Sequence, residues 1–217
     1  MDRLIARTAH IDDVGYYGGF VATASVDEWV AFLGSIVPST NPLQVMPPLQ
    51  RRNLGYRLQL MEFDCALLLL DRESTAPFYS TLHGSVRSMK IQQICVLAHS
   101  ILEGVGAHLW RAGQTAANLP VNPANKVRVT LWQPALVADV MGSQNPPQTT
   151  AAALSAQLAG ITGWRDRVHM DRFEPNDGLH FNEFTYAAAF DPTYRTFRMA
   201  LSAIAQPWPD TCLNEVI

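Results

Sequence analysis

Charged residues are scarce in this sequence. They make up 16% of the 217 residues, against about 25% in an average globular protein, while hydrophobic residues make up 48%. This composition excludes an intrinsically disordered chain, which needs low hydrophobicity and high net charge. The formal net charge of −3 gives no general basic field to hold nucleic acid. With so few charges for its size, we expect the protein to cover part of its surface with a partner.

Cysteines and long apolar runs are also few. The three cysteines, Cys65, Cys95 and Cys212, are far apart and form no Cys-x-x-Cys pair, so neither a disulfide framework nor a zinc finger is expected. This pattern indicates a cytoplasmic protein with reduced, buried thiols. The longest strongly apolar run, residues 65–70, is far shorter than the roughly 20 residues of a membrane-spanning helix. The first seven residues lack the apolar core of a secretory signal, and no membrane partner is expected.

Common cofactor and nucleophile motifs are missing as well. The glycines of residues 15–19 are not followed by the Lys-Ser/Thr pair of a phosphate-binding loop, and no Gly-x-Ser-x-Gly elbow occurs. His99 and Glu103 are one helical turn apart, but His108 lies about 180° round the same helix, so one ion cannot bind all three. A metal would need a ligand from another helix, such as Glu62, Asp64 or His180. We therefore expect no metal and no cofactor.

Apolar residues repeat at three- and four-residue intervals through most of the chain, which is typical of amphipathic helices. The pattern predicts helices over 27–37, 49–72, 78–111, 150–170, 181–189 and 192–205. Residues 126–141 fit either a helix interrupted by Pro134 or an extended piece followed by a helix. Gly104 and Gly106 either weaken the longest helix or permit a close helix crossing. The predicted fold is an all-α, up-and-down bundle of six or seven helices. An irregular arm (1–25) precedes this single domain (26–206), and a short tail (207–217) follows it.

The most informative segment for function is 164–172. If it is helical, Arg165, His169 and Arg172 follow one another at i, i+4 and i+7 and share one face. Arginines can hold a phosphate through charge-assisted hydrogen bonds, and a histidine that titrates near neutral pH can move a proton. Asp166 could orient the imidazole or pair with a neighbouring arginine. These four residues are the candidate site.

This segment resembles the HEPN superfamily (higher eukaryotes and prokaryotes nucleotide-binding). Arg165, Asp166 and His169 match the family's arginine, polar follower and histidine, and residues 98–104 resemble a long-helix segment of some members. The resemblance implies a helical bundle that forms a homodimer and acts on RNA in toxin, antiviral-defence or RNA-processing systems. It also implies a metal-independent endoribonuclease. The three residues between Arg165 and His169 are fewer than in the RNase motif of the family.

The resemblance assigns each catalytic residue a role. The ribose 2′-hydroxyl would attack the adjacent phosphate, with His169 as general acid or base. Arg165 would stabilise the charge on the pentacoordinate phosphate, supported by Asp166 and Arg172. The alternative is a catalytically inactive helical module that binds RNA or a protein partner. A third interpretation is an ion-pair network, because acidic and basic residues nearly balance in this segment.

Overall fold

The computed structural model describes residues 5–12, 15–73, 84–114, 127–143, 145–168 and 183–211. Six α-helices and one π-helical turn lie in these ranges, which confirms the predicted helical bundle. The elements in chain order are strands β1 (Ile5–Asp12) and β2 (Gly15–Ala22), helices α1 (Val26–Gly34), α2 (Pro48–Glu73), α3 (Gly84–Ala112), α4 (Val129–Met141) and α5 (Ala151–Arg167), the π-helical turn η1 (Tyr186–Phe190), and helix α7 (Asp191–Ile204).

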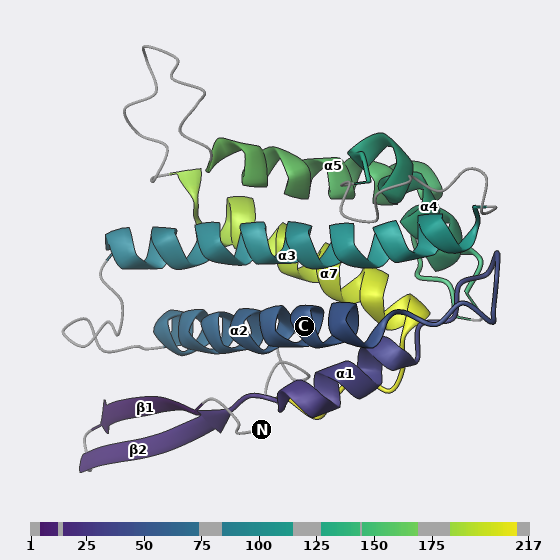
Figure 1. The fold of residues 1–217 in the computed structure, drawn as a ribbon. Helices are drawn as coiled ribbons and strands as arrows, with labels where there is room; N and C mark the ends of the chain where they lie inside the picture. The colour runs from purple at the N-terminus through teal and green to yellow at the C-terminus, as the bar shows by residue number, and fades with distance from the viewer. Residues whose placement is uncertain are drawn as a thin grey trace.

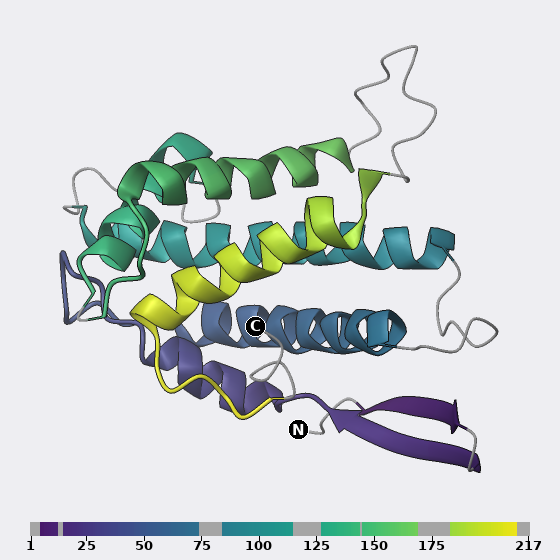
Figure 2. The same ribbon diagram turned by 180° about the vertical axis from the view of Figure 1, so that it is seen from behind.

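The long helices run up and down the bundle. Helices α2 and α3 lie side by side with opposite directions, while α5 and α4 cover α3 from the other side (Figure 1). Seen from behind, α7 crosses obliquely over α3 toward the C-terminal end of α1 (Figure 2). Helix α3 is therefore the central element, and its buried residues point toward several neighbours at once. None of the helices in the described residues is long and apolar enough to cross a bilayer.

The N-terminal arm is not irregular, contrary to the prediction. Strands β1 and β2 form an antiparallel hairpin in which Ile5 pairs with Ala22 and Asp12 with Gly15. The glycines of this segment suggested an irregular loop. Its aromatic and β-branched residues, which favour extended backbone, determine the conformation instead. The hairpin lies beside the bundle, below α2 in the view of Figure 1.

Local signals explain where the helices begin. Ser25 and Glu28 form a reciprocal capping box at the start of α1, and the Thr150 side chain accepts a hydrogen bond from the Ala153 amide at the start of α5. The segment 129–141 is a helix despite Pro134, which settles the alternative that the sequence left open. Residues 181 and 182 of the helix predicted over 181–189 lie outside the described residues, and in the rest of that range continuous helical structure begins only with the π-helical turn at Tyr186.

Two glycines let α2 and α4 approach α3 closely. A Cβ atom built on Gly104 would lie 2.8 Å from Cδ2 of Leu54, and one built on Gly106 would lie 2.8 Å from the carbonyl oxygen of Trp132. Both distances are shorter than a carbon atom tolerates. The glycines therefore permit close helix crossings, as one of the two sequence interpretations proposed. Gly160 on α5 is the opposite case, with no atom within 4 Å of its Cβ position.

Alanine substitutions at Gly106 and Gly160 are expected to have opposite effects. Gly106→Ala should lower the free energy of unfolding by about 1–3 kcal/mol, because the Trp132 carbonyl belongs to the backbone and cannot turn away. Gly160→Ala should raise it by up to about 1 kcal/mol, because alanine is the better helix former in open space. Urea unfolding followed by circular dichroism measures both. Equal effects of the two substitutions would contradict the close crossing at Gly106.

Candidate functional site

Two predicted site residues, Arg165 and Asp166, form an ion pair in the last turn of α5. Nη1 of Arg165 lies 2.8 Å from Oδ1 of Asp166, and the two side chains are 30% and 34% exposed. The pair is therefore at the surface and not packed inside the core. Asp166 partly neutralises the guanidinium that the sequence assigned to phosphate.

The neighbouring Arg167 is also engaged. It forms an ion pair with Glu183, and its guanidinium carbon lies 4.7 Å from the ring centre of Trp164. The end of α5 thus carries two cations and two anions in contact, with no net charge among these four groups. This balance is what the ion-pair interpretation of the segment predicts.

The structure does not place the rest of the predicted site. Helix α5 ends at Arg167, with Val168 as its C-cap, so the helix on which the i, i+4 relation depended stops before position 169. His169 and Arg172 lie outside the described residues. The shared face of Arg165, His169 and Arg172 stays a prediction.

The histidines considered as metal ligands have other surroundings. His99 packs edge-on against Trp132, with ring centres 5.7 Å apart. His108 is buried, and burial, together with the nearby Arg111, lowers the pKa of its imidazole. Within the described ranges, no three His, Cys, Asp or Glu side chains are grouped as metal ligands. The structure does not describe His180.

Three arginines near the start of α2, Arg51, Arg52 and Arg57, form a basic cluster in the sequence, and two of them make surface contacts with neighbouring helices. Arg52 lies 3.9 Å from Asp27 and over the ring of Tyr56, and Arg57 donates a hydrogen bond to the Ser100 hydroxyl. These contacts connect α2 to α1 and α3. The cluster thus has a structural use that its sequence did not reveal.

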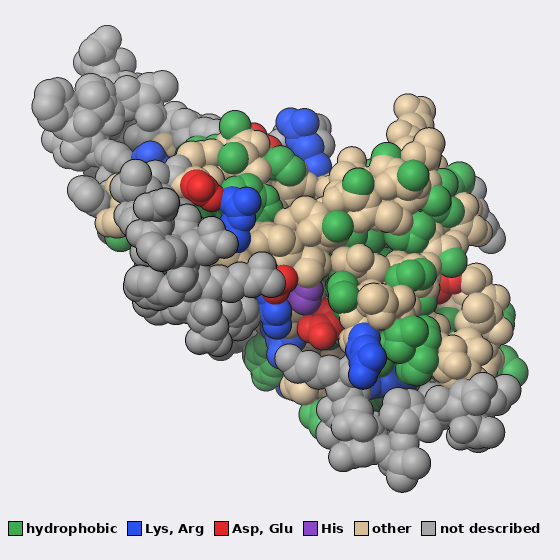
Figure 3. Space-filling view, turned by 90° about the horizontal axis from the view of Figure 1, so that it is seen from above, with side chains coloured by type: hydrophobic (Ala, Val, Ile, Leu, Met, Phe, Trp, Pro, Cys, Tyr) green, Lys and Arg blue, Asp and Glu red, His purple; other side chains and the backbone are tan. Residues whose placement is uncertain are grey.

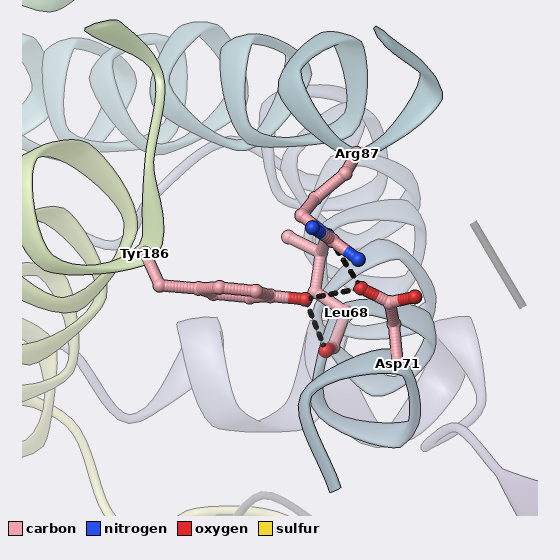
Figure 4. Close-up of polar contacts among 4 residues, drawn as sticks. All are labelled: Leu68, Asp71, Arg87 and Tyr186. Atoms are coloured by element: carbon pink, nitrogen blue, oxygen red, sulfur yellow. Dashed lines mark hydrogen bonds and ion pairs between the residues drawn. The ribbon is translucent and has the colours of Figure 1, made fainter. Parts of the chain in front are cut away.

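A buried polar network that the sequence did not predict links α2, α3 and η1. The Asp71 carboxylate has no exposed side-chain surface and accepts a hydrogen bond from Nε of Arg87 at 2.5 Å. The Tyr186 hydroxyl lies 3.0 Å from the same carboxylate oxygen and 2.7 Å from the carbonyl oxygen of Leu68 (Figure 4). One side chain from η1 is thereby tied to both the side chain and the backbone of α2.

A second carboxylate pairs with α3 two turns earlier on α2. Oδ1 of Asp64 accepts from Nζ of Lys90 at 2.7 Å, and the aspartate side chain has no exposed surface. Burial raises the pKa of Asp64, while Lys90 opposes that shift. Only one indication of these pairs was present in the sequence. Asp64 and Asp71 are seven residues apart in one predicted helix, and the cations that bind them, Lys90 and Arg87, are three residues apart in the next. Each carboxylate is paired with a cation of α3, so the two pairs fasten α2 to α3, while Oδ2 of Asp64 is buried without a hydrogen-bond partner among the described residues.

The thiols lie in the core as expected from the sequence. Cys65 and Cys95 are fully buried, and burial raises the pKa of Cys95 to about 11. A thiol with such a pKa is a poor nucleophile at neutral pH. Cys212 lies outside the described residues.

Uncharged residues cover one continuous region of the molecule. Residues 35–50 contain no charged residue, and residues 129–164 contain only Asp139, which is buried. If charged residues were as frequent in these 52 positions as in the whole chain, where they make up 16%, about eight of the positions would be charged. The two segments are joined, because the backbone amide of Ser39 donates to Asp139 at 3.1 Å. We call residues 35–50, which are the loop after α1 and the first three residues of α2, the loop 35–50. The loop 35–50, α4 and α5 as far as Trp164 together are the uncharged surface.

Large apolar side chains protrude from this surface. Along the loop, Leu43 is 91% exposed, Leu49 73%, Val37 60% and Val45 58%. Viewed from above the bundle, the right-hand part of the molecule, where α4 and the first half of α5 lie, shows mainly hydrophobic and other uncharged atoms (Figure 3). Acidic and basic side chains gather toward the left and the centre of that view.

Comparisons with known proteins identify no relative. No protein-family model matches the chain, and neither a curated protein nor a solved structure matches it. The functional argument therefore rests on the residues themselves.

Removing the partner of Asp64 is expected to destabilise the protein in a pH-dependent way. Lys90→Met should lower the free energy of unfolding by about 3 kcal/mol at pH 7.5, because the buried carboxylate loses its compensating charge. The pKa of Asp64 is already raised and should rise further, so the native state binds the extra proton. The stability lost in Lys90→Met should therefore be smaller near pH 5, where Asp64 of the folded variant binds a proton. It should grow as the pH rises through the pKa that Asp64 has in the folded state.

Urea unfolding at the two pH values tests this expectation. The double variant Asp64→Asn/Lys90→Met, which buries no charge, should recover most of the lost stability and show no extra pH dependence. A loss in Lys90→Met that is the same at both pH values would mean that packing, and not the ionised carboxylate, is responsible.

Proposed function

We propose that the protein is a helical binding module that works through a protein partner docked on the uncharged surface. The carrying observation is the group of four large apolar side chains on the loop 35–50, each more than half exposed. A large exposed apolar patch typically marks an interaction site, and these four side chains come from 13 consecutive residues, 37–49, without a charge among them. In this proposal the module is cytoplasmic.

The charge pattern supports docking of a protein at this surface. The core of a protein–protein interface is depleted of charged residues, because removing a charge from water is costly unless it is paired. On the uncharged surface only Asp139 is charged, and Ser39 of the same chain already binds it. A partner can therefore cover this surface without stripping water from an unpaired charge.

A fluorescent apolar probe, bis-ANS, is expected to bind the folded protein at this loop. Leu43→Ser/Leu49→Ser should reduce its fluorescence at least about two-fold, because most of the exposed apolar area of the loop is removed. Val86→Ser/Met89→Ser is the matched control, since these exposed apolar residues lie on α3, away from the uncharged surface, and it should leave the fluorescence unchanged. A wild-type protein that does not bind the probe would contradict the proposal.

A second candidate is a HEPN-like, metal-independent endoribonuclease. The supporting observation is that the Arg165 side chain remains 30% exposed at the end of α5, where RNA could reach it. His169 would be the general acid or base, Arg165 would stabilise the phosphate charge, and Asp166 and Arg172 would support it. The ion pair with Asp166 makes this candidate the weaker one, because the guanidinium is partly neutralised before RNA binds.

Cleavage of mixed RNA in the presence of EDTA distinguishes the two candidates. An endoribonuclease at this site should lose at least about a hundredfold in rate in both Arg165→Ala and His169→Ala. Arg167→Ala, which removes a neighbouring guanidinium held by Glu183, should keep the activity. Cleavage that persists unchanged in the first two variants would remove this site from consideration. We expect the binding module to cleave no RNA at all.

A further inference from the structure

We infer that the hairpin of β1 and β2 is a second docking site, which binds an extended segment of another protein as a third strand. This site is separate from the uncharged surface and goes beyond the proposed function. Three features of the hairpin support it: the open edge of β2, the place of that edge in the fold, and the charges of the two strands.

The hairpin leaves one edge of β2 without a neighbouring strand. Among the described residues the sheet has two strands, and β2 pairs with β1 over its full length, from Gly15 to Ala22. Backbone N–H and C=O groups alternate along the other edge, which the hairpin does not use. Such a row is complementary to another extended backbone, and adding a strand is a recurrent mode of peptide recognition. A third strand would also stabilise the sheet, because a hairpin of two strands is only marginally stable by itself.

The open edge belongs to the outer strand of the hairpin. Strand β1 contacts α2 and lies between α2 and β2 in the ribbon (Figure 1). The edge of β2 that is not paired with β1 is therefore directed away from the bundle. A partner segment can run along this edge without displacing a helix.

The outer strand lacks the residues that usually protect an open edge. Natural proteins place charges, above all lysine, and proline on such edges to prevent pairing with other chains. Strand β1 contains Arg7 and Asp12, whereas β2 contains no charged residue and no proline. Three of the eight residues of β2 are aromatic, and aromatic residues form favourable cross-strand pairs. We therefore expect the partner segment to be uncharged and rich in β-branched or aromatic residues.

The order of residues in β2 favours another protein over a second copy as the partner. If two copies paired in antiparallel orientation along the whole strand, Gly18 would lie opposite Gly19 and Gly15 opposite Ala22. Half of the cross-strand pairs would then include a glycine, although side-chain pairs across strands are what stabilises a sheet. A segment of another protein can place large side chains opposite Gly18 and Gly19 and cover them.

Fluorescence anisotropy with labelled peptides tests the inference on the full chain. The probe is an eight-residue peptide that alternates valine and threonine, flanked by lysines for solubility, and it should bind saturably. Two further peptides carry N-methyl groups on the odd or on the even residues only. Alternate amides of a strand point to the same side, so one of these peptides should lose at least about ten-fold in affinity and the other little. Equal losses, or none, would overturn the inference.

Gly19→Lys and Thr8→Lys are matched variants, because these two residues are paired in the hairpin. Lysine at position 19 places a charge on the strand that binds the peptide, and binding should weaken at least about five-fold. Lysine at position 8 lies one strand further away and should weaken binding less than about two-fold. Circular dichroism checks that both variants keep the helix content of the wild type. Equal effects of the two variants would contradict pairing at β2.

Leu43→Ser/Leu49→Ser should bind the peptide as tightly as the wild type does, because the uncharged surface is a separate site. Loss of binding in this variant would mean that the peptide docks on the uncharged surface, which overturns the inference and leaves the proposed function standing. A wild-type protein that does not bind the unmethylated peptide would overturn it too. If that protein forms a dimer that Gly19→Lys dissociates, the edge of β2 pairs with a second copy instead.

Discussion

The packing of the bundle depends on how closely helices α2 and α4 approach the central helix α3. Two positions on that helix, Gly104 and Gly106, have no side chain where Leu54 of α2 and Trp132 of α4 press against the backbone. A side chain at Gly106 would meet the backbone of α4 and push that helix outward, and one at Gly104 would force the Leu54 side chain to repack. Helix α4 connects in turn to both α5 and the loop 35–50. The shape of the uncharged surface is thus set by a contact inside the core.

Four ion pairs of the described residues lie at two places in the fold. Two pairs join α2 to α3 with buried carboxylates, and two surface pairs lie around the end of α5. The buried pairs hold helices in register and stabilise the fold only while both partners are present. The surface pairs contribute little to stability, but they leave the end of α5 close to neutral. By contrast, the loop 35–50, α4 and α5 as far as Trp164 have no exposed charge.

Sequence periodicity predicted the helices well because each α-helix buries a continuous apolar stripe. It failed where local composition was ambiguous. The glycines of residues 15–19 suggested a loop, although the segment pairs as a strand, and the end of the helix expected over 181–189 forms the π-helical turn Tyr186–Phe190. The contact between Arg165 and Asp166 could be foreseen, since they are neighbours in the chain. The ion pairs of Asp64 and Asp71 could not be foreseen, because they depend on how α2 and α3 are aligned along each other. The periodicity of one helix carries no information about that alignment.

The ties between α2 and α3 lie at opposite ends of the two helices. Asp71 binds Arg87 at one end, Leu54 packs against Gly104 at the other, and apolar residues fill the length between them. The two helices are thus held to each other near both ends of their shared length. Backbone amides in the middle of α2 and α3 should therefore exchange their hydrogens with solvent only when the whole domain opens, and those of α5, where most residues before Trp164 are exposed, should exchange sooner.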